Sequence, residues 1–267
     1  MPTIHAIPAF TNNYIWIIVN GPLQETTSRA TAAIVVDPGD AMPVLSFLQR
    51  WQLRLDTILV THHHHDHVGG IAELLRAHPA AVYGPPDEAI PAVTHPVRDG
   101  DRITPAHGMG EWAIMRVPGH TRGHVAFWEG NHLFCGDTLF GGGCGRVFDG
   151  SVEQLHSSLN KIAKLPTTTR IYCAHEYTVG NLVFGQCVEP SNAALSQRLS
   201  AARQMRANGM ATVPSMLGEE LATNVFLRCH VPAVYDAVCA HAGYELADAA
   251  AVFTALRRWK DQFKATV

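Results

Sequence analysis

Residues 57–70 read TILVTHHHHDHVGG, and this stretch decides the fold. A short β-rich run, 57–60, is followed by the spacing H-x-H-x-D-H from His62 to His67. On a tight loop leaving a strand, side chains two positions apart can point the same way. His62 and His64 can therefore bind one metal ion, while Asp66 and His67 turn toward a second. Imidazole nitrogens with a carboxylate oxygen suit Zn²⁺, Fe or Mn, and the absence of cysteine argues against a closed structural zinc site.

The alternative interpretation of this run is a histidine-rich surface loop or a purification tag. Tags are terminal, whereas this run is internal, contains Asp66 and precedes Gly69-Gly70 and a helical pattern. These features favour the metal site. His63 and His65 occupy the alternate positions, so we expect them to face outward or to support the ligands.

Three further strand-like runs end in residues that can complete the site: PGH (118–120), CGD (135–137) and CAH (173–175). Strands that deliver their ends to one sheet edge bring such residues together, although each one singly could equally be a core or turn residue. We predict His62, His64 and His120 on one metal, and Asp66, His67 and His175 on the other. Asp137, with two oxygens, would bridge them, and His124 would have a supporting role.

The surrounding pattern predicts a β-rich portion followed by helices. Strands are predicted at 14–19, 32–36, 57–60, 112–117 and 170–173, with a hairpin from 125–128 and 132–135. Helices are predicted from Ile71 to Pro79, after a capping box at Ser151 and Gln154, and at 195–205, 233–242 and 247–263. Residues 178–190 have no clear periodicity. We place a domain boundary there, with domains 1–177 and 178–267.

Composition narrows the class of protein. The 267 residues are 47% hydrophobic and 16% charged, which is typical of a compact globular chain. Lys and Arg total 20 against 23 Asp and Glu, without a basic block, so nucleic acid and anionic lipid are not expected partners. The six cysteines have no C-x-x-C pairing, so we expect reduced thiols. The sequence has no signal-peptide pattern and no long apolar run, so we expect a cytoplasmic protein without membrane contact. We expect a monomer that acts on a small molecule.

The segments THHHHDHVGG (61–70), PGHTRGH (118–124), FCGDTLFGGGCGR (134–146) and YCAHEYT (172–178) resemble the hydroxyacylglutathione hydrolases of the metallo-β-lactamase superfamily. H-x-H-x-D-H alone identifies only the superfold, which hosts several activities. The resemblance runs from near residue 3 to Phe263. It implies an αββα sandwich to about residue 177 and a C-terminal helical domain that binds glutathione.

The family's glutathione-binding tail is similar to RRWKDQF (257–263), which implies that Arg257 and Lys260 anchor the glycyl carboxylate of S-D-lactoylglutathione. On spacing alone, a solubilising pair or an i, i+4 contact between Arg257 and Asp261 is favoured instead. Arg146 and Tyr177 match further substrate-contacting positions.

Two positions depart from the family pattern. Phe148 stands where many members have Tyr, which puts one polar contact to the peptide in doubt. Val225 replaces a familiar Pro, and we expect Asn224 and Arg228 to be fold-keeping residues.

The resemblance implies thioester hydrolysis by a hydroxide held between two divalent metals, most readily Zn²⁺, with Asp66 orienting it and Asp137 as the second catalytic carboxylate. A glutathione thiolate leaves without a proton donor, since a free cysteine has a pKa of about 8.5. Two alternatives stay open: a mono-iron glutathione persulfide dioxygenase of the same superfold, and a non-catalytic metal-binding protein.

Overall fold

The computed structural model describes residues 2–23, 31–106 and 108–264, and the chain divides into two compact units. The first unit comprises Met1–Arg116 with Gly123–Gly136, and the second comprises Val117–Arg122 with Asp137–Val267. Each unit is described separately below.

The first unit contains a six-stranded sheet in the order β1-β2-β3-β4-β5-β6. Its strands are β1 (Pro2–Ala9), β2 (Asn13–Asn20), β3 (Thr31–Val36), β4 (Leu53–Leu59), β5 (Ala81–Gly84) and β6 (His95–Pro96). β1, β2 and β3 pair antiparallel, whereas β3, β4, β5 and β6 run parallel. The carboxyl ends of β3 and β4 therefore reach the same edge, where Asp37 and the histidine run follow them.

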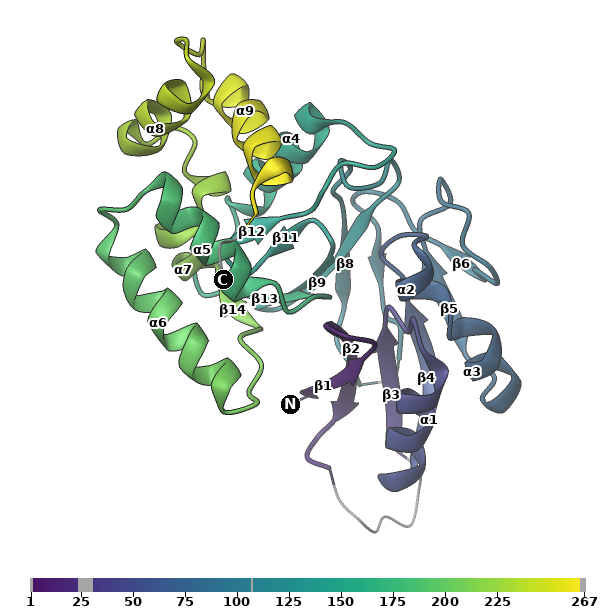
Figure 1. Ribbon diagram of the computed structural model, residues 1–267. Helices are drawn as coiled ribbons and strands as arrows, with labels where there is room; N and C mark the ends of the chain where they lie inside the picture. The colour runs from purple at the N-terminus through teal and green to yellow at the C-terminus, as the bar shows by residue number, and fades with distance from the viewer. Residues whose placement is uncertain (1, 24–30, 107, 265–267) are drawn as a thin grey trace. The chain divides into compact units, whose positions relative to one another are not determined.

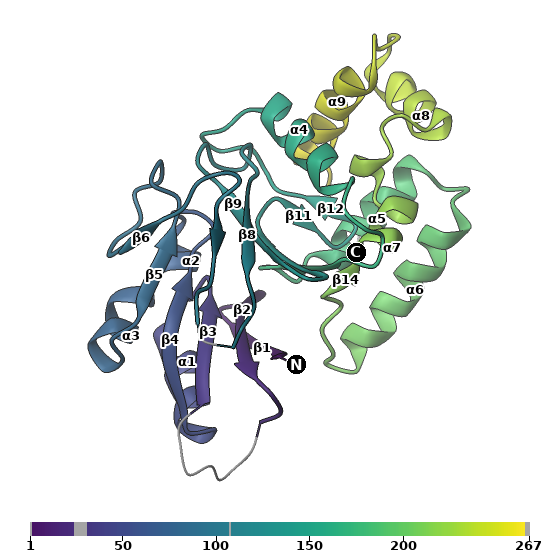
Figure 2. The same cartoon turned by 180° about the vertical axis from the view of Figure 1, so that it is seen from behind.

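Four strands of a second sheet belong to this unit: β7 (Arg102–Ile103), β8 (Trp112–Arg116), β9 (Val125–Glu129) and β10 (His132–Gly136). They pair antiparallel in chain order, and the strand order of the whole sheet is β14-β13-β10-β9-β8-β7, with β13 (Arg170–Cys173) and β14 (Ser215–Met216) from the second unit. The predicted hairpin is confirmed, with Leu133 opposite Trp128 and Phe134 opposite Phe127. Figures 1 and 2, which view the molecule from opposite sides, show the helices α1 and α3 on one face of the six-stranded sheet and the strands β8 and β9 on the other.

Three helices belong to this unit: α1 (Ala41–Arg50), α2 (His65–Val68) and α3 (Ile71–Ala77). Ile71 and Leu74 of α3 are fully buried in the core with Val44 and Leu48 of α1, as the apolar stripe of α3 predicts. The sequence patterns did not single out α1. It begins at Asp40, whose Oδ1 accepts a hydrogen bond from the Met42 amide at 3.0 Å.

The second unit is mainly helical. Its helices are α4 (Val152–Ile162), α5 (Thr178–Val188), α6 (Ala193–Ala207), α7 (Leu217–Thr223), the 3₁₀ turn η1 (Val225–Leu227), α8 (Pro232–Ala242) and α9 (Ala249–Gln262). It also contains two pairs of antiparallel strands. One pair is β11 (Leu139–Phe140) and β12 (Gly143–Cys144), and the other is β13 and β14. The capping box at Ser151 and Gln154 is present, with both reciprocal hydrogen bonds. Among the described residues, no helix has both the length and the apolar character that crossing a membrane requires.

Residues 178–190, which have no clear periodicity in the sequence, contain the helix α5 over Thr178–Val188. Its buried residues form one face, but that face includes the polar or small residues Thr178, Asn181 and Gly185, while the apolar Val179 and Val183 are only partly buried, so hydrophobicity does not follow burial. Phe184 on the buried face packs its ring on Phe226 of η1, on Trp259 of α9 and on Phe263. Burial of a Phe side chain stabilises a fold by about 1.5–3 kcal/mol, so this contact outweighs the weak local signal.

Candidate active site

The histidine run lies in the first unit, directly after β4. His62 and His67 are fully buried, His64 and Asp66 are half-buried, and His65 is exposed. The rings of His62 and His64 have centroids 4.7 Å apart, and those of His62 and His67 are 4.1 Å apart. The loop thus places three predicted ligand imidazoles together, while His65 faces outward as expected.

Asp37, which directly follows β3 and was not predicted as a site residue, holds this loop in place. The residue is buried and has φ +52, a left-handed conformation that Asp and Asn adopt more readily than most residues. Its Oδ1 accepts from the Thr61 amide at 2.8 Å, and its Oδ2 accepts from the Thr61 hydroxyl at 2.8 Å. His67 Nδ1 lies 3.0 Å from the same Oδ2. A buried acid at the end of strand 32–36 was the signal that could have identified this role.

This network sets the tautomer of His62. Because the Thr61 hydroxyl donates to Asp37, it accepts from His62 Nδ1, which lies 3.0 Å away. The His62 ring then uses Nδ1 for support and presents the lone pair of Nε2. A histidine that binds a metal through one nitrogen usually donates its other N–H to such a partner.

The neighbouring positions are also held from elsewhere in the first unit. Asn13 of β2 donates from Nδ2 to Asp66 Oδ2 at 3.0 Å, and His67 Nε2 lies 3.7 Å from that oxygen. Buried Glu88, a second residue that sequence reasoning missed, accepts from the His63 amide at 3.0 Å and the Gly123 amide at 2.6 Å, and also contacts the His63 ring. The supporting role expected for His63 agrees with these contacts.

His124 lies beside the histidine run within the first unit. Its fully buried ring stacks on that of His62, with centroids 4.6 Å apart and an interplanar angle of 17°. It follows Gly123, whose amide is held by Glu88. This placement agrees with the supporting role that we expected for His124.

The second unit holds the other three predicted ligands, His120, Asp137 and His175, all buried. His120 Nε2 lies 3.5 Å from Asp137 Oδ2, and His175 Nε2 lies 3.3 Å from the same oxygen. His120 Nδ1 is 2.7 Å from the Arg146 carbonyl oxygen, so it donates there and Nε2 carries the lone pair of the ring. One carboxylate oxygen therefore faces two imidazole nitrogens from separate stretches of chain, as expected of a bridging ligand.

Two aromatic side chains cover these imidazoles. The exposed ring of Tyr177 stacks on His175 at 4.8 Å with an interplanar angle of 3°, and the exposed ring of Phe148 meets the ring of His120 edge-on at 5.1 Å. Both residues were predicted to contact substrate. The second unit therefore places two solvent-accessible aromatic surfaces directly against two candidate metal ligands.

The predicted substrate-binding cations also lie in the second unit, around Asp261. Arg146 Nε is 3.3 Å and Arg257 Nη2 is 2.9 Å from Asp261 Oδ1, so the i, i+4 contact weighed from spacing is formed. The Lys260 amino group lies 5.3 Å from the ring centroid of Phe184. Burial, with the charge of Arg257, lowers the pKa of Lys260. Three cations against one carboxylate leave this cluster positively charged.

Arg257 is more buried than its proposed role suggests, with 4% of its surface exposed. Its Nη1 donates to the Cys144 carbonyl at 3.2 Å and the Gly145 carbonyl at 3.4 Å, and its guanidinium lies over the Phe226 ring. Lys260 is half-buried and the Arg146 side chain is 64% exposed, so these two cations are the more accessible ones.

The donor set fits a pair of divalent metals. The candidates supply five imidazoles and two carboxylates without a thiolate, which suits Zn²⁺, Fe or Mn. The hydrogen-bonded Nδ1 atoms of His62 and His120 leave two Nε2 atoms as ligand atoms. In each unit, hydrogen bonds within the protein therefore orient at least one imidazole for metal binding.

The metallo-β-lactamase superfamily profile matches residues 26–175, and the profile described as hydroxyacylglutathione hydrolase C-terminus matches residues 176–263. Curated hydroxyacylglutathione hydrolases are similar over nearly the full chain. That of Alkalilimnicola ehrlichii is 52% identical over 98% of this chain and 100% of its own length, and that of Halorhodospira halophila is 50% identical over 98% and 99%. That of Pseudomonas fluorescens is 48% identical over 98% and 100%.

Solved structures agree on the fold. The BLEG-1 B3 metallo-β-lactamase has a TM-score of 0.59 at 22% identity, covering 84% of this chain and 99% of the other. A metallo-β-lactamase from Staphylococcus aureus has a TM-score of 0.59 at 20% identity, covering 85% of this chain and 62% of the other. The metallo-β-lactamase fold with a C-terminal helical region, predicted from the motifs, is confirmed.

Proposed function

This chain belongs to the hydroxyacylglutathione hydrolases of the metallo-β-lactamase superfamily, and on that premise we propose that it cleaves S-D-lactoylglutathione and related S-(2-hydroxyacyl)glutathiones into glutathione and a 2-hydroxy acid. The observation that carries the proposal is about 50% identity to such enzymes over 98% of the chain. The reaction would serve methylglyoxal detoxification. The enzyme is a metal-dependent hydrolase, and a persulfide dioxygenase or a non-catalytic protein is not favoured.

We propose that the seven ligands of the two units act together. His62, His64 and His120 would hold one ion, Asp66, His67 and His175 the other, and Asp137 both. Support comes from Asp137 Oδ2, which lies within 3.5 Å of two ligand nitrogens. Two bound divalent ions, of which Zn²⁺ is our choice, would lower the pKa of water to about 7 and polarise the thioester carbonyl. Metal analysis of the purified protein would test that choice.

The protein's own groups would then direct the reaction. Asp66, held by Asn13, keeps a carboxylate oxygen where it can accept a hydrogen bond from the attacking water and orient it. No general acid is needed, because the glutathione thiolate is a good leaving group with a conjugate acid of pKa about 8.5. An amide nitrogen would need a proton donor, so thioesters suit this set of residues better than peptides.

Recognition of the tripeptide would depend on the second unit. Glutathione carries carboxylates at its two ends, and the cluster of Arg146, Arg257 and Lys260 is positively charged. Lys260 and Arg146 would contact the glycyl carboxylate, and Arg257 would add charge from its buried position. The Tyr177 ring would pack against the substrate beside His175, and Phe148 would supply an apolar contact without a hydroxyl.

We also propose a monomeric cytoplasmic enzyme whose catalytic domain ends near residue 177 and whose helical glutathione-binding domain comprises 178–267. The positions at which the two family profiles meet, 175 and 176, support that division. Size-exclusion chromatography with light scattering would test the monomer, and cell fractionation would test the location.

Thiol release from S-D-lactoylglutathione tests the function. We expect turnover that stops after treatment with a chelator and returns when Zn²⁺ is added, because the nucleophile depends on metal. Oxygen uptake with glutathione persulfide is the control reaction, and we expect none. A metal-loaded protein without thioesterase activity would refute the proposal, and oxygen uptake would establish the dioxygenase instead.

A further inference from the structure

Residues 139–146, which we call the glycine hairpin, connect the candidate metal ligands of the second unit to its cationic cluster. Leu139 pairs with Cys144 and Phe140 with Gly143 across the β11–β12 turn. Asp137 lies two residues before the hairpin, and Arg146 ends it. Gly142 at the turn has φ +65, and a Cβ there would come within 2.7 Å of the Leu182 side chain. A displacement of this short segment would therefore move both Asp137 and Arg146.

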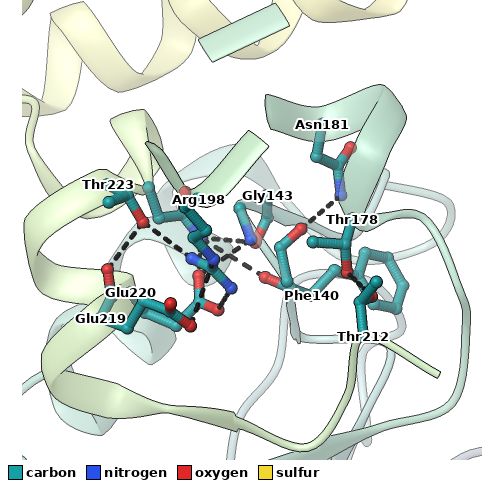
Figure 3. A network of polar contacts seen from close by, with 12 residues as sticks. Phe140, Gly143, Thr178, Asn181, Arg198, Thr212, Glu219, Glu220 and Thr223 are labelled. Carbon is teal, nitrogen blue, oxygen red and sulfur yellow. Dashed lines mark hydrogen bonds and ion pairs between the residues drawn. The ribbon is translucent and has the colours of Figure 1, made fainter. Parts of the chain in front are cut away.

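Side chains from outside the hairpin bind six of its backbone carbonyls. Asn224 Nδ2 donates to the carbonyls of Phe140 (3.4 Å) and Gly143 (2.9 Å), and Asn181 Nδ2 donates to that of Gly141 (3.1 Å). Arg257 Nη1 donates to the carbonyls of Cys144 (3.2 Å) and Gly145 (3.4 Å). His120 Nδ1 donates to the Arg146 carbonyl (2.7 Å). Figure 3 shows this arrangement around Phe140 and Gly143. The backbone position of the hairpin is thus set mainly by side-chain contacts made with its carbonyls.

A buried ion pair secures the turn itself. Glu220 of α7 is fully buried, and its Oε2 accepts from the Gly142 amide at 2.9 Å and from Asn224 Nδ2 at 3.1 Å. Its other oxygen pairs with Arg198 of α6, which also donates to the Thr223 hydroxyl at 2.7 Å. Burial alone would lower the pKa of Arg198, but the charge and hydrogen bond of Glu220 outweigh it and raise that pKa. A buried charge is costly without such a partner.

We propose that Glu220 is a positioning residue for the reaction. Its carboxylate, neutralised by Arg198, aligns Asn224 and the Gly142 amide and so sets the backbone that carries Asp137 and Arg146. The carbonyl of Arg146 in turn orients His120 through Nδ1. The inference rests on the proposed function, because it assigns Glu220 to the placement of that same site.

A second buried ion pair provides a matched control. Glu189 is also buried and pairs with Arg228 through both carboxylate oxygens, at 2.6 and 2.9 Å. Its side chain also accepts from Asn192 Nδ2 at 2.9 Å, and none of its hydrogen bonds within the described part of the chain goes to the glycine hairpin. The two carboxylates thus share burial and an arginine partner but differ in what they hold.

The experiment compares Glu220→Gln with Glu189→Gln. Each glutamine puts an amide where an oxygen accepted hydrogen bonds, so both variants should unfold at lower temperature. Only Glu220→Gln should lower kcat/KM for S-D-lactoylglutathione, by about 10- to 100-fold, because a misplacement of about 1 Å has effects of that size. Asn181→Ala, which removes a single donor to the Gly141 carbonyl, is the milder variant to use if Glu220→Gln does not fold.

Hydrogen exchange and metal retention give readouts independent of activity. Glu220→Gln and Asn181→Ala should speed amide exchange over residues 140–148 and hasten metal loss to a chelator, whereas Glu189→Gln should match the wild type in both. Equal exchange, metal loss and kcat/KM in Glu220→Gln and Glu189→Gln would overturn the proposal. If the wild type lacks thioesterase activity, the proposed function fails, and exchange with metal loss still decides the role of Glu220.

Discussion

The two groups of candidate metal ligands, one in each unit, are held in different ways. Residues 61–67 present four ligands on one continuous stretch of chain, and neighbouring strand ends support them, chiefly through Asp37. In the second unit, by contrast, His120, Asp137 and His175 come from three separate stretches. The glycine hairpin beside them is held by side chains as distant in sequence as Glu220 and Arg257.

This difference predicts which substitutions disturb each group. The group in the first unit should lose metal binding when a ligand or its immediate partner is changed. The group in the second unit should also lose it when residues far away in the sequence are changed, because long-range contacts set its backbone. The four predictions below test these two groups.

The largest effect is expected for Asp137→Ala. Removing the carboxylate that faces both His120 and His175 should leave kcat below about one thousandth of the wild-type value, because the proposed bridge between the ions is lost. Steady-state kinetics with metal analysis would measure it. Retention of more than a tenth of the wild-type activity, roughly a loss of 1.4 kcal/mol or less, would contradict a bridging role.

An intermediate effect is expected for Asp37→Asn. Asparagine keeps the left-handed backbone but puts an amide where one oxygen accepted a hydrogen bond from Thr61, and it removes the charge beside His67. Loss of such a partner typically lowers metal affinity or activity by about 10- to 100-fold. The matched control is Asp40→Asn, which changes a helix cap in the same turn and should alter neither quantity. Equal metal affinities in the two variants would refute the role of Asp37.

The smallest effect is expected for Lys260→Ala, which should raise KM about tenfold with little change in kcat. A hydrogen bond to a charged group contributes about 1.5–3 kcal/mol, and the proposed contact of Lys260 with the glycyl carboxylate is partly solvated, so its loss should cost the lower end of that range. Arg258→Ala, an exposed cation on the same helix, is the control and should leave KM unchanged. A tenfold rise in both variants would indicate a general charge effect instead.

The same lysine predicts a pH dependence. Burial and Arg257 lower the pKa of Lys260 from its ordinary 10.5, and the amino group is charged only below its pKa. KM should therefore rise as the pH increases, and the rise should begin at lower pH than for an ordinary lysine. In Lys260→Arg the rise should be absent, because arginine stays charged. If KM rises in Lys260→Arg by the same amount and from the same pH as in the wild type, the pH dependence belongs to another group.

The elements predicted from sequence were those with a strong local signal. The strand before His62, the hairpin of β9 and β10 and the helix of Leu155 and Leu159 all have regular alternation or a single apolar stripe. The helix α5 lacked such a stripe because its buried face includes Asn181 and Gly185, while the apolar Val183 is only partly buried. Periodicity detects a helix whose buried face is uniformly apolar and misses one whose buried face also contains polar and small residues.

The sequence alone determined the ligand types and the family, because the spacing of His62, His64, Asp66 and His67 lies on one short stretch and depends on local geometry. Only the tertiary structure decided what supports those ligands. Asp37, Glu88 and Glu220 act through contacts 24, 25 and 78 residues away along the chain, and Arg257 is buried against carbonyls 112 and 113 residues away. Such partners are chosen by the packing of distant elements, which leaves no periodic mark in the sequence.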